Sequence, residues 1–402
     1  MLRPVASSPS ISRSPVPSVS QLMGGMFLGG FECSCHRLED GRRLDLQLST
    51  RHLEFADQDY ARLRRVGIST CRDGVSWVRT EPQRGRFDFS QAARLLGAAR
   101  RNGVRIIWDL MHFGWPDDVD VFGLELPQRF GAYARAFAQF LANESDEAPI
   151  ISPINEISFL SWAGADVRIM NPFVSARGVE LTVQLVRATI EAIEGFRSVL
   201  PDTRFLQTDP VINIVASPDH PKTWRRVEGD NLLQYQAWDM LVGDIWPSLG
   251  GNSSYLDIVG VNYYPDNQFM LDGETVLRGD PRYKPFSSIL QEVWQRYRRP
   301  MIISETGAEG DLRAPWLRYV CDEASVALQS GVELHGITLY PIVNHPGWVD
   351  DRRCENGLFD YAAADGTRAV NAPLAEELHR AAPHLLALRD SIDEPCALAV
   401  TG

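Results

Sequence analysis

Two glutamates stand at the ends of apolar runs, where a pair of carboxyl groups could do acid–base chemistry. Glu156 closes the run PIISPINE, which begins at Pro149, and Glu305 closes MIISE, which begins at Met301. Burying an ionised carboxylate beside such a run is costly unless it is paired or hydrogen-bonded. Glycoside hydrolysis uses two carboxyl groups flanking a cleft, one protonated to serve the leaving oxygen and one ionised to attack or stabilise the sugar carbon. Taken singly, each glutamate could instead belong to a structural ion pair.

The elements that must position these glutamates repeat along the chain, because eight short apolar runs alternate with helical stretches. The runs are LMGGMFLGG (from Leu22), VGISTCRDG (Val66), VRIIWDLMH (Val104), PIISPINE (Pro149), RFLQTDP (Arg204), LDIVGVNYY (Leu256), PMIISETG (Pro300) and HGITLYP (His335). Strands buried on both faces and each followed by a helix favour a parallel sheet, and eight such units close into a single (β/α)8 TIM barrel. The alternative is an open doubly wound sheet, but no G-x-G-x-x-G or P-loop motif follows the first run.

Nearly every predicted strand ends on a polar or reactive side chain. These residues are Arg72 and Asp73, Asp109 and His112, Asn155 and Glu156, Asp209, Asn262 with Tyr263 and Tyr264, Glu305, and Tyr340 followed by Asn344 and His345. In a parallel barrel the C-terminal ends of the strands surround one pocket. We therefore expect these side chains to converge on a single place.

Length and composition fit either two ordinary domains or one large barrel, and the absence of a linker-like break after the tail favours a single soluble domain. The first twenty residues are rich in Ser and Pro and lack an apolar signal segment, so we expect a disordered tail at 1–20, the barrel at 21–390 and a C-terminal tail at 391–402. The formal charge is −12 and no Lys/Arg-rich run occurs, which argues against nucleic acid as a partner. No segment is apolar and long enough to span a bilayer, so we expect no membrane association and a cytoplasmic location.

Six cysteines are scattered through the chain, and without an export signal reduced thiols are expected. Cys33 and Cys35 raise the question of a metal site, but no second pair follows at zinc-site spacing. Asp73, Asp109 and Asp209 could suggest a divalent cation, but they end different strands without clustered ligands. We expect neither a metal nor an organic cofactor.

At the two glutamates the chain resembles glycoside hydrolase family 1, the β-glucosidase family, and the wider set of retaining (β/α)8 glycosidases. PINEI is similar to the family's T-x-N-E-P, and ISETG to its I-T-E-N-G. The resemblance implies a retaining β-glycosidase that acts on a carbohydrate β-glycoside, with Glu156 as acid/base and Glu305 as nucleophile. The likeness covers most of the barrel from FLGGFECS onward.

Three further segments extend the resemblance. STCRDGVSWVRTEPQRG is similar to Y-R-x-S-x-x-W-x-R-x-x-P-x-G, which implies that Arg72 lies beside the nucleophile and keeps Glu305 ionised, with a low pKa. IIWDLMHFGWP is similar to L-x-H-W-D-x-P, which implies that His112 donates to a sugar hydroxyl. Arg72 could instead be only a counter-ion, and His112 could be structural.

VGVNYY is similar to the family's I-G-x-N-Y-Y. The resemblance implies that Asn262 lines the sugar site and that Tyr264 hydrogen-bonds Glu305. By the same resemblance, Asn155 would contact the sugar 2-OH, an interaction that strengthens in the transition state.

The likeness fails where the family identifies its sugar. The family's W-S-x-x-D-N-F-E-W holds the sugar 4-OH and 6-OH through its Glu and Trp, whereas YPIVNHPGW has Gly347 in place of that Glu and keeps only Trp348. The family's A-T-S-A-Y-Q is matched by FECSCHR, so Arg37 falls at a hydroxyl-reading Gln, with Glu32 and His36 close by. The bond-breaking residues are therefore expected to be whole and the specificity to have changed.

Several alternatives stay open. Asp350, Asp351 and Arg352 could supply a cation for an acidic or phosphorylated sugar, or could be a solvated run of charges. Within the same chemistry, a transglycosidase would pass the sugar to an acceptor other than water. A sugar-binding barrel without turnover would also explain the altered sugar contacts, although it needs no such pair of carboxylates. The sequence leaves the sugar, the aglycone and homo-oligomerisation undecided.

Overall fold

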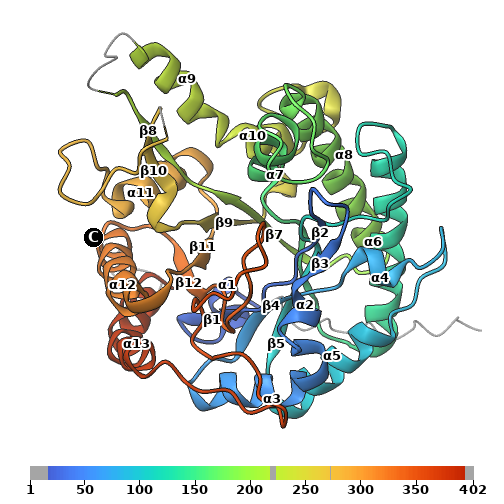
Figure 1. Ribbon diagram of the computed structural model, residues 1–402, viewed down its shortest axis with the longest axis horizontal. Coiled ribbons are helices and arrows are strands. Elements are labelled where there is room, and N and C mark those ends of the chain that lie inside the picture. Colours follow the sequence, from blue (N-terminus) through green and yellow to red (C-terminus); the bar gives the residue numbers. More distant parts are fainter. Residues whose placement is uncertain (1–16, 218–222, 272, 394–402) are drawn as a thin grey trace, which may run out of the picture.

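The computed structural model describes residues 17–217, 223–271 and 273–393, and eight parallel strands form one closed barrel at its centre (Figure 1). The strands are β1 (Phe27–Gly30), β4 (Thr70–Gly74), β5 (Arg105–Met111), β6 (Ile150–Ile154), β7 (Arg204–Pro210), β9 (Ile258–Asn262), β11 (Met301–Thr306) and β12 (Leu334–Leu339). Seven of them lie within the apolar runs and β12 begins one residue before its run, and around the barrel they follow chain order, with β12 pairing β1. The predicted (β/α)8 barrel is confirmed.

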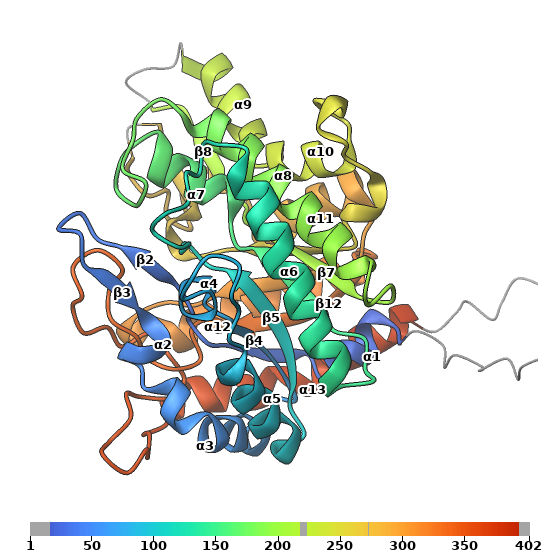
Figure 2. The ribbon, with the colours of Figure 1, turned by 90° about the vertical axis from the view of Figure 1, so that its right-hand side faces the viewer.

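Helices surround the barrel, as Figures 1 and 2 show. They are α1 (Val19–Met23), α2 (Leu46–Ser49), α3 (His52–Arg65), α4 (Trp77–Thr80), α5 (Ser90–Asn102), α6 (Glu125–Glu144), α7 (Ile157–Ala165), α8 (Gly178–Arg197), α9 (Trp224–Leu233), α10 (Gln236–Val242), α11 (Phe286–Tyr297), α12 (Arg313–Gln329) and α13 (Ala372–Asp393). Their amphipathic faces bury one large core against the outside of the strands.

A second, smaller core fills the inside of the barrel. One inward residue from each of six strands packs there with three residues of α1: Leu28, Ile107, Ile150, Leu206, Ile258, Ile302, Val19, Leu22 and Met23. Because α1 precedes β1, it covers the N-terminal end of the barrel. Figure 2 shows α1 at the opposite end of the molecule from the hairpin of β2 (Cys35–Arg37) and β3 (Arg43–Asp45).

The ends of the barrel domain differ slightly from the prediction. Helix α1 begins at Val19, inside the predicted tail, because Ser18 caps it through a capping box with Gln21. Helix α13 runs to Asp393, three residues beyond the predicted end of the barrel at 390. The predicted tails otherwise fall largely on residues 1–16 and 394–402, which lie outside the described residues.

Several short features were not predicted, among them helix α7 and two pairs of three-residue strands. Helix α7 reads ISFLSWAGA, which is apolar on most sides and therefore shows no helical period. The β2–β3 hairpin and the pair of β8 (Asn213–Val215) with β10 (Gln268–Met270) consist of three-residue strands, too short for a pattern of alternation. Within the described part of the chain, no helix is long and apolar enough to cross a membrane.

Candidate active site

The polar residues predicted to converge do lie at one end of the barrel. Arg72 is in β4, Glu305 is in β11, and Asn262 ends β9 beside Glu305 in register. Asn155 and Glu156 follow β6 directly. This is the C-terminal end of the strands, where TIM-barrel enzymes carry their active sites.

Glu156 occupies a sharp turn between β6 and α7. Its backbone is left-handed, with φ of 51°, a conformation that is uncommon for a residue with a side chain and that concentrates at functional sites. Its N–H donates to the carbonyl of Thr208 at 3.0 Å, and its Oε1 accepts from Asn262 Nδ2 at 2.8 Å. Asn262 is oriented in turn because its Oδ1 accepts from Ser304 Oγ at 2.5 Å.

Glu305 is held from two sides. Arg72 Nη1 donates to its Oε1 at 2.8 Å, and the Tyr264 hydroxyl donates to its Oε2 at 2.9 Å. The side chain of Glu305 is 1% exposed and that of Arg72 is fully buried. Both contacts predicted for Glu305 are therefore present.

The expected low pKa of Glu305 is wrong. Burial raises the pKa of Glu305, and the positive charges of Arg72 and His112 lower it without reversing the shift. Burial also raises the pKa of Glu156 well above its usual range, and the negative charge of Glu305 adds to the effect. Because Glu305 touches a guanidinium and Glu156 does not, Glu156 is the carboxyl that keeps its proton.

Arg72 links Glu305, the candidate nucleophile, to Asp109 and Asn155 through hydrogen bonds. Its Nη2 donates to Asp109 Oδ2 at 2.7 Å and to Asn155 Oδ1 at 2.9 Å. Asn155 Nδ2 lies 3.0 Å from His112 Nε2. Burial alone would lower the pKa of His112, but the negative charges of Glu32 and Asp109 raise it above its usual value. A continuous polar network thus runs from Glu305 to His112.

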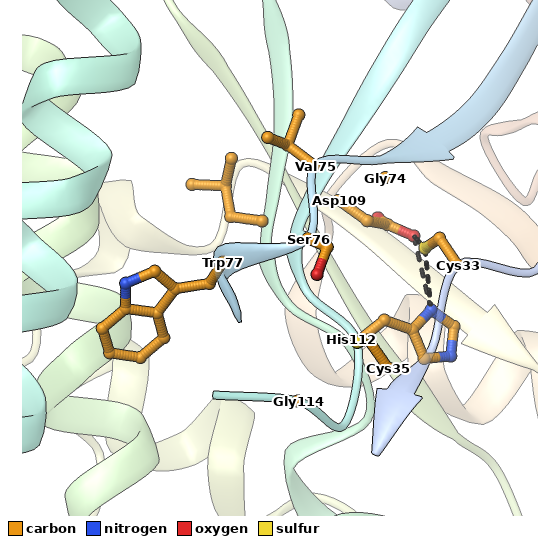
Figure 3. A pocket seen from close by; sticks show the side chains of 10 residues that line it. Cys33, Cys35, Gly74, Val75, Ser76, Trp77, Asp109, His112 and Gly114 are labelled. Atoms are coloured by element: carbon orange, nitrogen blue, oxygen red, sulfur yellow. Dashed lines mark hydrogen bonds and ion pairs between the residues drawn. The ribbon is translucent and has the colours of Figure 1, made fainter. Parts of the chain in front are cut away.

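Cys33, Asp109 and His112 form a buried group whose side chains could together hold a metal ion. Figure 3 shows them beside a small cavity of about 10 Å³, with Cys33 Sγ 3.4 Å from His112 Nδ1. Asp109 is already the ion-pair partner of Arg72, and a bound cation would face that guanidinium. Asp109 Oδ1 is buried without a partner among the described residues, but because a cation there would lie beside the Arg72 guanidinium we assign no metal to this group.

The other two aspartates considered as cation ligands serve local structure. Asp73 accepts from Tyr60 at 2.6 Å and pairs with His52 at 2.8 Å. Asp209 accepts from the hydroxyl of Ser158 in α7 at 2.6 Å. The five described cysteines are free and buried, while Cys396 lies outside the described residues.

The residues predicted to identify the sugar are only partly brought together. Glu32 is buried, and its Oε1 lies 3.6 Å from His112 Nε2. Arg37 lies in β2, where its 40% exposed side chain pairs with Asp117 and lines a surface groove together with His36 and Trp348. The sequence register alone could not reveal this difference, because the local geometry of the hairpin decides where Arg37 points.

Trp348 lies in the loop after β12 and borders a surface groove. Its ring centroid is 5.5 Å from that of Phe113 and 6.0 Å from that of Phe159. Phe159 and Phe173 line the same groove, and Phe159 lies one turn along α7 from Glu156. Sequence reasoning missed Phe159 because helix α7 itself was not predicted.

The charges after Trp348 form exposed ion pairs. Arg352, with a side chain that is 54% exposed, forms a bidentate ion pair with Glu309 at N–O distances of 2.7 and 2.8 Å. Arg352 Nε also lies 3.6 Å from Asp350. This arrangement favours a solvated run of charges over a cation reserved for an acidic sugar.

Comparisons with known proteins agree with the fold. No protein-family model and no curated protein matches the chain. A family 1 β-glucosidase from Thermotoga maritima is structurally similar, with a TM-score of 0.72 and 17% sequence identity over 89% of this chain and 97% of that chain. A β-glucosidase from the same organism in complex with deoxynojirimycin gives the same TM-score, and a complex with isofagomine lactam gives 0.73 with 16% identity. The chain therefore has the fold of family 1 β-glucosidases.

Proposed function

We propose that this protein is a retaining β-glycosidase that hydrolyses O-glycosidic bonds. The observation that carries the proposal is the unequal environment of two buried carboxyl groups at one barrel mouth. Glu305 accepts hydrogen bonds from Arg72 and Tyr264, which favour its ionised form against the effect of burial, whereas Glu156 has an amide partner and a pKa raised well above its usual range. One neutral and one charged carboxyl are what the reaction needs.

Each residue of the site has a distinct role in the proposed reaction. Asn262 engages Glu156 Oε1, so Oε2 is the atom that carries the proton and passes it to the glycosidic oxygen. Glu305 attacks the anomeric carbon, the bond to the aglycone breaks, and a covalent glycosyl intermediate forms on Glu305. Glu156, now ionised, takes a proton from water as the water attacks the same carbon and releases Glu305. Asn155, His112 and Trp348 bind sugar hydroxyls.

The retaining assignment makes a geometric claim about the bound state. A direct attack by Glu305 requires the two carboxyl groups to lie about 5 Å apart across the sugar, whereas inverting enzymes leave roughly 6.5–9.5 Å for a water molecule. A crystal structure with a bound glycone mimic measures this distance, and a separation in the larger range would contradict the proposal.

Trapping the covalent intermediate tests the function directly. The protein is incubated with a panel of activated 2-deoxy-2-fluoro β-glycosides of different configuration, and peptide mass spectrometry locates any sugar adduct. We expect an adduct on Glu305 in the wild type and in the control Glu376→Gln, which changes an exposed glutamate of α13. Glu305→Gln should remain unlabelled. Absence of labelling across the panel, with aryl glycosides also untouched, would instead support a sugar-binding barrel.

A further inference from the structure

Glu32 is a buried carboxylate, and only one of its two oxygens accepts a hydrogen bond. It lies two residues beyond β1, and its Oε1 accepts from the N–H of Ser34 at 2.8 Å. Its Oε2 is buried and has no hydrogen-bond partner among the described residues. Buried carboxylate oxygens are rarely left alone, because losing water without gaining a partner is costly. The unpartnered oxygen therefore points to a ligand.

The position of Glu32 places it at the candidate active site. Its Oε1 is 3.6 Å from His112, which contacts Asn155, the residue before Glu156. The negative charge of Glu32 is also one of the influences that raise the pKa of Glu305. Glu32 thus faces the same barrel mouth as the two reacting carboxyl groups, from the side of β1.

Two neighbouring side chains share this feature. His36 Nε2 donates to the carbonyl of Trp348 at 2.8 Å, which leaves His36 Nδ1 buried without a partner in the described structure. Burial lowers the pKa of His36, so the ring is neutral and Nδ1 is a hydrogen-bond acceptor. The indole N–H of Trp348 is a buried donor that likewise has no partner among the described residues. The cluster therefore offers two acceptors and one donor, a set suited to hydroxyl groups.

The charge at this end of the barrel limits what can bind. Glu32, Asp109 and Glu305 supply three carboxylates beside the protonated Glu156, and Arg72 and His112 lie among them as basic groups. The carboxylate of Glu32 is ionised, because the nearby His112 and His345 and the Ser34 N–H lower its pKa against the effect of burial. An anionic sugar would bring another negative charge into this setting.

The two other basic residues considered for the sugar are occupied elsewhere. Arg37 pairs with Asp117, and Arg352 pairs with Glu309, both at exposed positions. Neither is available as a counter-ion to a carboxylate or phosphate on the sugar without breaking its own pair.

We infer that Glu32 is a specificity-determining residue of the glycone pocket, whose Oε2 accepts hydrogen bonds from a hydroxyl or ammonium group of the sugar. The inference rests on the proposed glycosidase function and gives it a substrate class: β-glycosides of neutral or amino sugars, and not of uronic acids or phosphorylated sugars. Glu32 thereby takes over a role in sugar recognition on the side of the barrel where Gly347 offers no side chain.

The test compares Glu32→Gln with the wild type and with Glu376→Gln. Gln keeps an oxygen that can accept from Ser34, so the melting temperature should be unchanged. We measure kcat/KM for 4-nitrophenyl β-glycosides of glucose, galactose, 2-amino-2-deoxyglucose and glucuronic acid. Wild type and control should favour the first three over the glucuronide. In Glu32→Gln, kcat/KM for the first three substrates should fall about 10- to 100-fold, as expected for loss of a hydrogen bond to a charged group. The kcat/KM for the glucuronide should not fall.

A binding measurement separates failure of this inference from failure of the proposed function. Calorimetry with isofagomine lactam, an uncharged sugar mimic, should show weaker binding to Glu32→Gln by a similar factor without any need for turnover. If the wild type shows no turnover and no adduct but its lactam binding depends on Glu32, the hydrolase function fails and the recognition role stands. An equal loss on all four substrates, or no loss, would overturn the role of Glu32. Absence of lactam binding and of turnover in the wild type would overturn both.

Discussion

The bond-breaking side of the barrel mouth, at Glu305 and Asn262, and the sugar-reading side, at Glu32, His36 and Trp348, differ in how completely the polar atoms of these side chains are partnered. At the ends of β9 and β11, both oxygens of Glu305 accept hydrogen bonds, and Asn262 is bound at both ends of its amide. Around the ends of β1 and β12, Glu32, His36 and Trp348 each keep a buried polar atom with no partner in the described structure. On the proposed function, Glu305 is oriented before a sugar arrives, whereas the unpartnered atoms of Glu32, His36 and Trp348 gain their partners from the sugar.

The largest effect should come from the bond-breaking side. Replacing Glu305 with Gln leaves Arg72 and Tyr264 with an uncharged partner and removes the nucleophile. We expect kcat for an aryl β-glycoside to fall by about 10⁴-fold or more, as for loss of other enzymic nucleophiles. Glu376→Gln should retain full activity. Retention of more than a tenth of the activity in Glu305→Gln would show that the bond is broken elsewhere.

The second prediction concerns Glu156→Gln and pH. Activity requires Glu305 ionised, so it is lost as pH falls below the pKa of Glu305, and it requires Glu156 protonated, so it is lost as pH rises above the pKa of Glu156. Because burial raises both pKa values, both limbs of the pH profile should lie above the usual range of a glutamate.

Glu156→Gln should remove the alkaline limb and keep the acidic one. It should also lower kcat by about 10²- to 10⁴-fold for substrates whose leaving group needs protonation. A 2,4-dinitrophenyl glycoside, whose leaving group needs no proton, should show a smaller loss in its first step. An alkaline limb that survives in Glu156→Gln would assign the acid to another residue.

A smaller effect is expected for Tyr264→Phe. The change removes the hydroxyl that donates to Glu305 Oε2 at 2.9 Å, and the ionised carboxylate loses a stabilising partner. The pKa of Glu305 should rise, which moves the acidic limb to higher pH, and kcat should fall about 10-fold or more. Tyr255→Phe is the matched control, because Tyr255 precedes β9 at the other end of the barrel. An unmoved acidic limb in Tyr264→Phe would contradict the assigned contact.

The smallest expected effect concerns Arg352, which follows Trp348 in the loop after β12. Arg352→Gln breaks an exposed pair with Glu309, and such pairs contribute about 0–1 kcal/mol to stability. We expect the melting temperature to change little and kcat/KM for neutral glycosides to change less than about twofold, because Arg352 is paired with Glu309 and touches neither reacting carboxyl group in the described structure. A selective loss for an acidic or phosphorylated sugar would instead make Arg352 part of the recognition site.

Prediction from the sequence was most successful for the barrel strands and for the polar residues at their ends. All eight barrel strands could be predicted, because a strand buried on both faces is a continuous apolar run that ends abruptly at a polar residue. The same ends identified Arg72, Glu156, Asn262 and Glu305, which the structure brings together.

Prediction from the sequence was weaker for properties that depend on the direction of a side chain or on its depth of burial. Arg37 points to the surface because β2 and β3 form a hairpin of three-residue strands, which leaves no pattern to detect. The pKa of Glu305 was misjudged because a sequence reveals a nearby charge more readily than the depth of burial. Phe159 was missed because the helix that carries it, α7, is apolar on most of its surface.

The filling of the barrel by α1 has a kinetic consequence. Since Val19, Leu22 and Met23 pack against the inner core at the N-terminal end, the glycone must enter and every product must leave at the C-terminal end. On the proposed mechanism, the aglycone then departs along the route by which the next water or acceptor arrives. A slowly departing aglycone would compete with water for the glycosyl intermediate, so the balance between hydrolysis and transfer depends on how quickly that shared passage clears.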